Sequence, residues 1–304
     1  MEHVKPLYNL LLLSGKGEDF RQLSMEALFD RLLKKGVSLD KARFLGFAAE
    51  CDTPEDLAEL LLAEQVGEEE YDPLYLVLFE LWRRLVPEKQ SLSIFGDELD
   101  HRIALYHQGE LESDEPIQDA LANLLEVLEE NTDLGAKPEE IFGAISQFSA
   151  HHLEEFLYEY ILDLLETGNQ LYAEELLEGY IPYCPHSLGL AFLKIRASGH
   201  LEELKSLFKK PLDLPLLLDI LAYLSIHGEP HLFVLAMQKG ISLLEVEQDL
   251  IDLLEIAAEY YQRLDQEDKE TKVQKILKKR THPEAALQKS DPDVAALRQM
   301  MAIG

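Results

Sequence analysis

Glycines and prolines interrupt this 304-residue chain at intervals that suit short helices. Glycines that end apolar-periodic runs stand at 36, 67, 109, 135, 168, 199 and 240, so the successive gaps are 31, 42, 26, 33, 31 and 41 residues. Between these breaks leucine, glutamate, alanine and lysine dominate, all good helix formers, and no stretch shows the sustained two-residue alternation of a strand. The pattern predicts an all-α protein of antiparallel helix hairpins.

Several runs begin with residues that satisfy the free N–H groups of a helix start. The tetrapeptide Thr-Pro-Glu-Asp at 53–56 supplies a cap, an N1 proline and first-turn acids in order, and the Asp-Pro pair at 72–73 repeats the device. We therefore expect helices to begin at both places, and Ser38 to cap the run 39–50.

The breaks also suggest how the chain is organised. The most polar breaks, 110–116 and 131–138, place a boundary near residue 134. We predict an N-terminal helical module (1–134), a C-terminal helical-hairpin module (135–280) and a short helical tail (281–304). The loose period fits hairpins stacked as an irregular α-solenoid, and it fits two helical bundles equally well.

The charge of the chain restricts its partners. Asp and Glu number 58 against 28 Lys and Arg, which gives a formal net charge of −30. Such a charge repels phosphate backbones and anionic lipid, so we expect no nucleic-acid partner and no membrane partner. It favours a basic protein partner, although it also serves to keep a protein in solution.

Cysteine usage and hydropathy indicate the compartment. Cys51 and Cys184 lie in no metal-type spacing, and we interpret them as reduced core residues. The longest apolar block near the N-terminus, residues 10–13, is too short for a signal-peptide core, and no apolar run reaches 18 residues. These features predict a cytoplasmic protein without a membrane span.

One segment reverses the charge of the chain. Seven basic residues and only two acidic ones lie between 269 and 289, for a local charge of +5, so the rest of the chain carries −35. This segment either neutralises acidic neighbours within its own fold or docks onto an acidic partner, including a second copy of the chain. Homo-oligomerisation therefore stays open.

Recognisable catalytic chemistry is absent from the sequence. A carboxylate and a histidine share a helix face at Glu98 and His101, and again at His152 and Glu155, and these could hold a metal only if the two helices met. The Ser-Gly-Lys-Gly stretch at 14–17 lacks the spacing of a phosphate-binding loop. We predict a protein that is not an enzyme and has no cofactor and no metal.

Aromatic residues recur at helical spacing in one run. Tyr71, Tyr75, Phe79 and Trp82 fit the packed face of a helix, or else an exposed groove for a partner helix or peptide. Trp82 is followed by Arg83, and tryptophan and arginine are enriched at binding hot spots. Trp82 and Arg83 are therefore candidate protein-binding residues.

Residues 157–185 resemble a tetratricopeptide (TPR) repeat over about one repeat. The resemblance rests on a small residue at the turn, a small residue on the second helix, a closing proline and two large first-helix residues, namely Gly168, Ala173, Pro185, Leu157 and Leu164. Ile161 and Tyr180 stand where the family has small residues. The resemblance implies a peptide-binding or scaffolding module without enzymatic activity. In that family first-helix side chains line the concave face, which here implicates Glu155, Tyr158 and Leu162.

The leading hypothesis is an adaptor, scaffold or chaperone that binds a basic or amphipathic segment of a partner protein. Apolar anchors would supply affinity, and the acidic surface would supply steering. The alternatives are an acidic mimic that occupies a nucleic-acid-binding surface and a helical-bundle metal enzyme.

Overall fold

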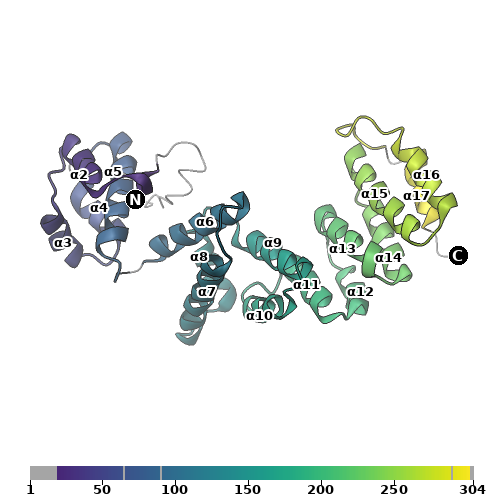
Figure 1. Cartoon of the computed structure of the whole chain (residues 1–304), viewed down its shortest axis with the longest axis horizontal. Coiled ribbons are helices and arrows are strands. Elements are labelled where there is room, and N and C mark those ends of the chain that lie inside the picture. Colours follow the sequence, from purple (N-terminus) through teal and green to yellow (C-terminus); the bar gives the residue numbers. More distant parts are fainter. Residues whose placement is uncertain (1–18, 64–65, 90, 289, 302–304) are drawn as a thin grey trace. The chain divides into compact units, whose positions relative to one another are not determined.

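The computed structural model describes residues 19–63, 66–89, 91–288 and 290–301 (Figure 1). In these ranges the regular elements are 16 α-helices and two short 3-10 helices, with no strand, which confirms the all-α prediction. Residues 1–159 and 182–185 form one compact unit, and residues 160–181 and 186–304 form a second. The boundary predicted near residue 134 lies within the first unit, between α7 and α8, and the proposed division into modules stays a prediction.

The first unit contains the elements η1 (Phe20–Gln22), α2 (Met25–Lys34), α3 (Lys41–Ala49), α4 (Pro54–Leu62), α5 (Glu68–Leu85), α6 (Leu92–Gln108), α7 (Glu115–Asp133), α8 (Pro138–Ser146) and the start of α9 (Leu153–Glu166). Helices α2 and α4 pack against α5, and α3 packs against α4. Their inward faces meet in one apolar core that is centred on α5 and includes the fully buried Trp82. Helices α6, α7 and α8 pack against one another.

Helix α5 begins earlier than the sequence suggests. It starts at Glu68 after Gly67, and Pro73 lies inside it rather than at its first position. Tyr75, Phe79 and Trp82 are all buried by the neighbouring helices, so this aromatic run is core. The interpretation of the run as an open aromatic groove is therefore wrong, because the α5 face that carries it is the one covered by other helices.

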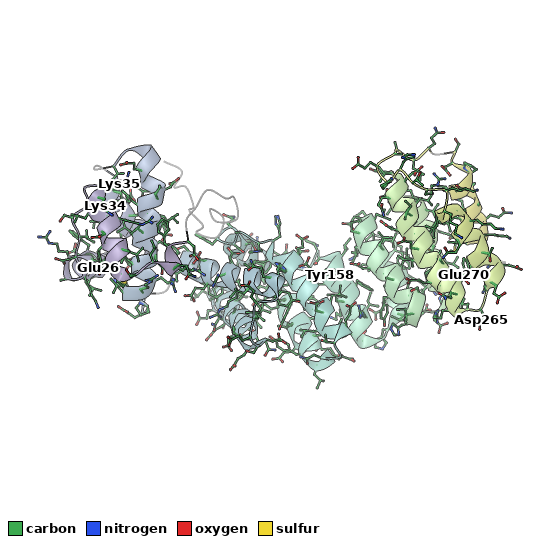
Figure 2. The ribbon with its side chains drawn as sticks, turned by 45° about the horizontal axis from the view of Figure 1, so that its top comes forward. Glu26, Lys34, Lys35, Tyr158, Asp265 and Glu270 are labelled. Carbon is green, nitrogen blue, oxygen red and sulfur yellow. The ribbon has the colours of Figure 1, made fainter. Side chains whose placement is uncertain are left out.

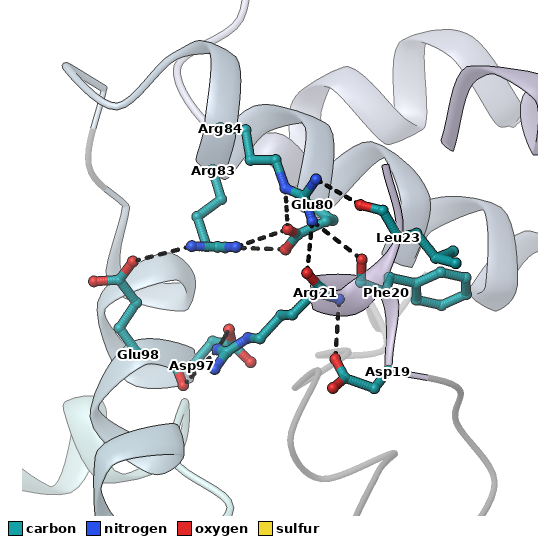
Figure 3. A network of polar contacts seen from close by, with 9 residues as sticks. All are labelled: Asp19, Phe20, Arg21, Leu23, Glu80, Arg83, Arg84, Asp97 and Glu98. Atoms are coloured by element: carbon teal, nitrogen blue, oxygen red, sulfur yellow. Dashed lines mark hydrogen bonds and ion pairs between the residues drawn. The ribbon is translucent and has the colours of Figure 1, made fainter. Parts of the chain in front are cut away.

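A buried carboxylate holds the N-terminal turn against α5 (Figure 3). Glu80 is 1% exposed and accepts two hydrogen bonds from Arg83, at 2.9 and 2.7 Å, and one from Nε of Arg84. The guanidinium of Arg84 then donates to the backbone oxygens of Phe20, Arg21 and Leu23 at 2.7 to 3.2 Å. A buried carboxylate is energetically costly unless it is paired. The hydrogen bonds of Glu80 and Arg84 therefore fix the position of η1 on α5.

A second buried carboxylate joins α6 to the start of α9. Asp100, fully buried, accepts hydrogen bonds from the Ser149 hydroxyl (2.5 Å) and from the backbone N–H groups of Ala150 and His151 (2.6 and 3.1 Å). The Nδ1 atom of His151 lies 3.0 Å from the same carboxylate. These bonds satisfy both oxygens of Asp100 and set where α9 begins.

The second unit contains the end of α9 followed by α10 (Gln170–Tyr180), α11 (Leu188–Ser198), η2 (Leu201–Glu203), α12 (Leu204–Leu207), α13 (Leu214–His227), α14 (Pro230–Ile241), α15 (Glu247–Arg263), α16 (Glu267–Leu277) and α17 (Pro292–Met300). Helices α13, α14 and α15 pack against one another, and α16 packs along α15. Phe233 and Tyr260 stack with ring centroids 3.7 Å apart, which joins α14 to α15. None of the helices in the described ranges is both long enough and apolar enough to cross a lipid bilayer.

Asp97 makes the stability of the first unit depend on pH. Burial outweighs the attraction of Arg21 and raises the pKa of Asp97 to about 6 from an ordinary 3.8. The folded state therefore favours the neutral form, so the contribution of this group to stability increases as the pH falls through 6. We expect the wild type to gain about 1 kcal/mol over Asp97→Asn between pH 7.5 and pH 5, as measured by urea unfolding of both proteins. A stability difference that is flat, or that falls on acidification, would contradict the assignment.

Candidate protein-binding groove

Helix α3 carries more apolar side chains than the core of its unit covers. Its sequence is KARFLGFAA, yet only Phe44 and Ala48 are buried. Phe44 holds the helix in place by an edge-to-face contact with Phe29, with ring centroids 6.4 Å apart. Leu45 and Phe47 remain 37% and 38% exposed. A soluble helix ordinarily turns polar residues to water, so these two exposed apolar side chains, one on each flank of the buried face, are unusual and suggest contact with another surface.

A groove of about 550 Å³ runs along the flank of α3 that carries Phe47. It is lined by residues of the α2–α3 loop, of α3 and of α4, namely Val37, Ser38, Leu39, Arg43, Gly46, Phe47, Glu50 and Leu61. The α3 members occur at positions i, i+3, i+4 and i+7, which is one face of a helix. The groove is therefore floored by a single face of α3 and walled by its neighbours in the chain.

The wall on the α2 side is set by a glycine turn. Gly36 adopts a left-handed conformation (φ 90°), which favours glycine, and ends α2. The N–H of Gly36 donates to Leu33 and the N–H of Val37 to Leu32, at 3.0 and 2.9 Å, the pairing of a Schellman motif. Asp40 then starts α3 by accepting the Arg43 N–H at 2.8 Å. The predicted cap, Ser38, lies two residues too early and lines the groove instead.

The other end of α3 is held by a lysine. The ammonium of Lys89 donates to the carbonyl oxygens of Ala48, Ala49 and Cys51 at 3.0, 3.2 and 2.7 Å. The last carbonyls of a helix lack intrahelical partners and carry partial negative charge, so a cation there is stabilising. The indole N–H of Trp82 donates to the backbone oxygen of Lys89 at 3.1 Å and fixes the segment that carries the lysine.

Trp82 is therefore not a contact residue, contrary to the sequence-based prediction. The Trp82 side chain is 0% exposed. Its effect on α3 is indirect, because its hydrogen bond fixes the backbone of Lys89, which caps the helix. Arg83 is one-quarter exposed, pairs with Glu80, and has its NH1 atom 3.8 Å from Glu98. A partner contact at Arg83 stays a prediction.

A smaller cavity of about 130 Å³ lies beside Trp82 and offers less to a ligand. Its three cationic lining residues are Arg83, Lys89 and Arg102. The first two make the contacts described above, and Arg102 donates to the backbone oxygen of Pro116 at 2.9 Å. Because the fold already uses all three cations, we place the candidate site in the α3 groove.

Exposed apolar side chains are concentrated in the stretch of chain that forms the groove, although of these only Phe47 lines it. Of the eight large apolar residues that are exposed in the described ranges, four lie between residues 33 and 60, namely Leu33, Leu45, Phe47 and Leu60. That stretch is less than a tenth of the chain, so the concentration is far above an even spread. None of the candidate residues predicted from the sequence lies in this groove. The available signal was α3 itself, which has three large apolar side chains, Phe44, Leu45 and Phe47, within four consecutive positions of a nine-residue helix.

The face predicted on α9 lies at the surface. Glu155 is exposed, while Tyr158, labelled in Figure 2, and Leu162 are half-buried. The three residues share one face of α9 by their spacing, but the division between the two units falls between Glu159 and Tyr160. Their role in binding a partner stays a prediction.

Helices α9 and α10 form where the TPR resemblance places them. Gly168 in the turn has a φ of 83°, Ala173 is fully buried, and Pro185 lies in the turn before α11. These features agree with helix punctuation of that kind, while the resemblance to the family stays a prediction.

The two segments with an acid and a histidine meet in the structure through residues next to the predicted ones. Asp100 contacts His151, and its carboxylate is taken up by the hydrogen bonds at the start of α9. Burial raises the pKa of the Cys184 thiol to about 12, which opposes formation of a thiolate nucleophile. Across the described residues, no three His, Cys, Asp or Glu side chains are grouped so that they could hold a metal ion. The Ser-Gly-Lys-Gly stretch and the leucine block 10–13 lie outside the described residues.

Part of the basic segment neutralises its own neighbours. Arg280 pairs with Glu247, Asp291 and Asp293 at 3.2, 2.6 and 2.7 Å, and the ammonium of Lys269 lies 5.0 Å from the centroid of the Tyr261 ring. The Arg280 pairs join the segment that follows α16 to α15 and to the start of α17, and the Lys269 contact joins α16 to α15. Two of the seven basic residues between 269 and 289 therefore make contacts within the second unit.

Comparison of the chain with protein-family models, with curated protein sequences and with solved structures found no significant match.

The capping of α3 by Lys89 can be tested with a substitution that removes the ammonium charge and keeps a side chain of similar length. We expect Lys89→Met to lower the free energy of unfolding by about 1–2 kcal/mol, because three carbonyl oxygens lose a charged donor. Urea unfolding of the purified chain measures the change. Lys205→Met is the matched control, since Lys205 pairs with the exposed Glu202 on the surface, and its cost is expected to stay below about 1 kcal/mol. Equal costs for the two variants would show that Lys89 is an ordinary surface lysine.

Proposed function

We propose that this protein is a non-catalytic adaptor that binds an amphipathic segment of another protein in the α3 groove. The observation that carries the proposal is the exposed ring of Phe47, which faces the α3 groove instead of the core and shares it with the apolar side chains of Val37, Leu39 and Leu61. Exposed apolar patches of this kind mark interaction sites in soluble proteins. Two buried, free cysteines support a reducing, cytoplasmic location as part of the proposal.

The groove supports a binding mode in which a few apolar anchors supply the affinity. Phe47 is the largest exposed ring in it, with Leu39 and Leu61 on the neighbouring walls. Each partner side chain of leucine or phenylalanine size that becomes fully buried contributes about 1.5–3 kcal/mol. Two or three such anchors offset the entropy of docking, so the interaction is of moderate strength and reversible.

We expect Phe47→Glu to remove partner binding, because it places a charge where an apolar anchor docks. Immobilised full-length chain is used to capture partners from a lysate of cells that express it, and the bound proteins are quantified by mass spectrometry. The specific partners are those that decrease at least about tenfold with Phe47→Glu, the size of effect expected for a hot-spot side chain.

The matched control is Leu171→Glu, which introduces the same charge at a side chain that is 83% exposed on α10 and outside the groove. Its captured proteins should equal those of the wild type. Circular dichroism of both variants checks that the helices are retained. If no captured protein depends on Phe47, the groove is not the binding site and the proposal is wrong.

A further inference from the structure

The lining of the α3 groove favours an occupant without charge. Its two charged residues, Arg43 and Glu50, have opposite signs, and its other members are apolar or small. Lys35, which is labelled in Figure 2 and precedes the groove by two residues, forms an ion pair with Glu70 at 2.6 Å. The lining therefore selects neither an acidic nor a basic segment, and affinity for the groove has to come from the burial of apolar side chains.

The chain itself contains an uncharged apolar segment outside the described residues. Residues 7–13 read Leu-Tyr-Asn-Leu-Leu-Leu-Leu, and no charge occurs in the segment or directly next to it, although 28% of the chain is charged. The run 10–13 is the longest run of leucine in the sequence. The two runs of three leucines, 60–62 and 216–218, belong to α4 and α13, which pack against other helices of their units. A run of four apolar residues is unfavourable in water, so we expect it to be covered.

The attachment of this segment brings it within reach of the groove. Residues 14–18 connect it to Asp19, and the turn η1 that follows is fixed on α5 by Arg84. Helix α2 comes next, and its C-terminal end leads through Gly36 into the groove. The ten residues of α2 rise about 15 Å, whereas residues 7–18 can span up to about 40 Å. Two of the five connecting residues are glycine, so the sequence permits a return along α2.

Covalent attachment favours this segment over a free peptide of the same sequence. A segment on a short connection acts at an effective concentration in the millimolar range, provided that the connection can span the two sites. A weak apolar contact is then enough to keep the groove occupied. A partner has to compete with the attached segment, so its apparent affinity falls in proportion to the fraction of chains whose groove is open.

We infer that residues 7–13 of the chain occupy its own α3 groove and that a partner segment binds by displacing them. The inference rests on the proposed function and deepens it by adding regulation at the same site. The occupant is assigned from the balanced charge of the lining, the uncharged leucine-rich sequence of the segment and the length of its connection to η1.

A photo-crosslinker at position 12 tests where the segment lies. Leu12 of the full-length chain is replaced by p-benzoylphenylalanine, and the adduct formed on irradiation is located by mass spectrometry. We expect the adduct within residues 37–61 of the same chain, because these residues carry the groove lining. Phe47→Glu should lower its yield at least about tenfold, as expected for the loss of a hot-spot side chain. Leu171→Glu, the matched charge outside the groove, should leave the yield unchanged.

A synthetic peptide of residues 5–16 tests the competition. The peptide carries a fluorescein label and has a lysine at each end, and its binding to the full-length chain is followed by fluorescence anisotropy. We expect the double variant Leu11→Glu/Leu12→Glu to bind the peptide at least about tenfold more tightly than the wild type, because its own segment no longer fills the groove. Adding Phe47→Glu to the double variant should remove this binding.

The matched control for the double variant is Leu134→Glu/Leu171→Glu. It introduces the same two charges at side chains that are 87% and 83% exposed and lie outside the groove. Its affinity for the peptide should equal that of the wild type, and circular dichroism of both double variants checks that the helices are retained.

The outcomes separate the inference from the function on which it rests. An adduct outside residues 37–61, or no adduct, overturns the occupancy of the groove, and an adduct that joins two copies of the chain overturns occupancy within one chain. Equal affinity of the peptide for the wild type and for Leu11→Glu/Leu12→Glu, or binding to neither, overturns the displacement. In all these cases the proposed function stands if captured partners still depend on Phe47. If they do not, the proposed function is wrong even where the adduct forms in the groove.

Discussion

A short helix is stable in water only when its apolar stripe is covered by a neighbour, and the arrangement of both units follows from that constraint. In the first unit α5 supplies the central surface, and α2 and α4 cover it with their inward faces. Helix α3 obeys the constraint with Phe44 and Ala48 alone, which leaves Leu45 and Phe47 at the surface. Of these two exposed side chains, Phe47 lines the groove.

Buried polar groups determine which of many similar helix packings is adopted. Leucine-rich faces fit together in several registers, but a buried carboxylate is tolerated only where all its partners are in place. Glu80 with Arg84 locates the N-terminal turn on α5, and Asp100 locates the start of α9 on α6. Lys89 does the same for the end of α3 through three carbonyl oxygens. These contacts hold α3 in a fixed position, with Phe47 exposed among the residues that the structure describes.

The same physical reasons explain where sequence-based reasoning stopped short. Cap residues are local, so the start of α4 at Pro54, with Thr53 as its cap, was predictable from the sequence. Pro73 was misleading, because a proline within the first turns of a helix resembles a proline at its start. Trp82 was assigned to the surface because arginines follow it. In the structure both arginines pair with the buried Glu80, and Arg84 also binds backbone oxygens that lie 61 to 64 residues earlier in the chain.

The sequence by itself determined the all-α class and helix starts such as that of α4, because capping, helix propensity and periodicity act over a few residues. Only the tertiary structure decided which apolar residues stay uncovered, since exposure depends on neighbours that are distant in sequence. Phe44 and Phe47 look alike in the sequence, and packing against α2 and α4 buries one and leaves the other in the groove.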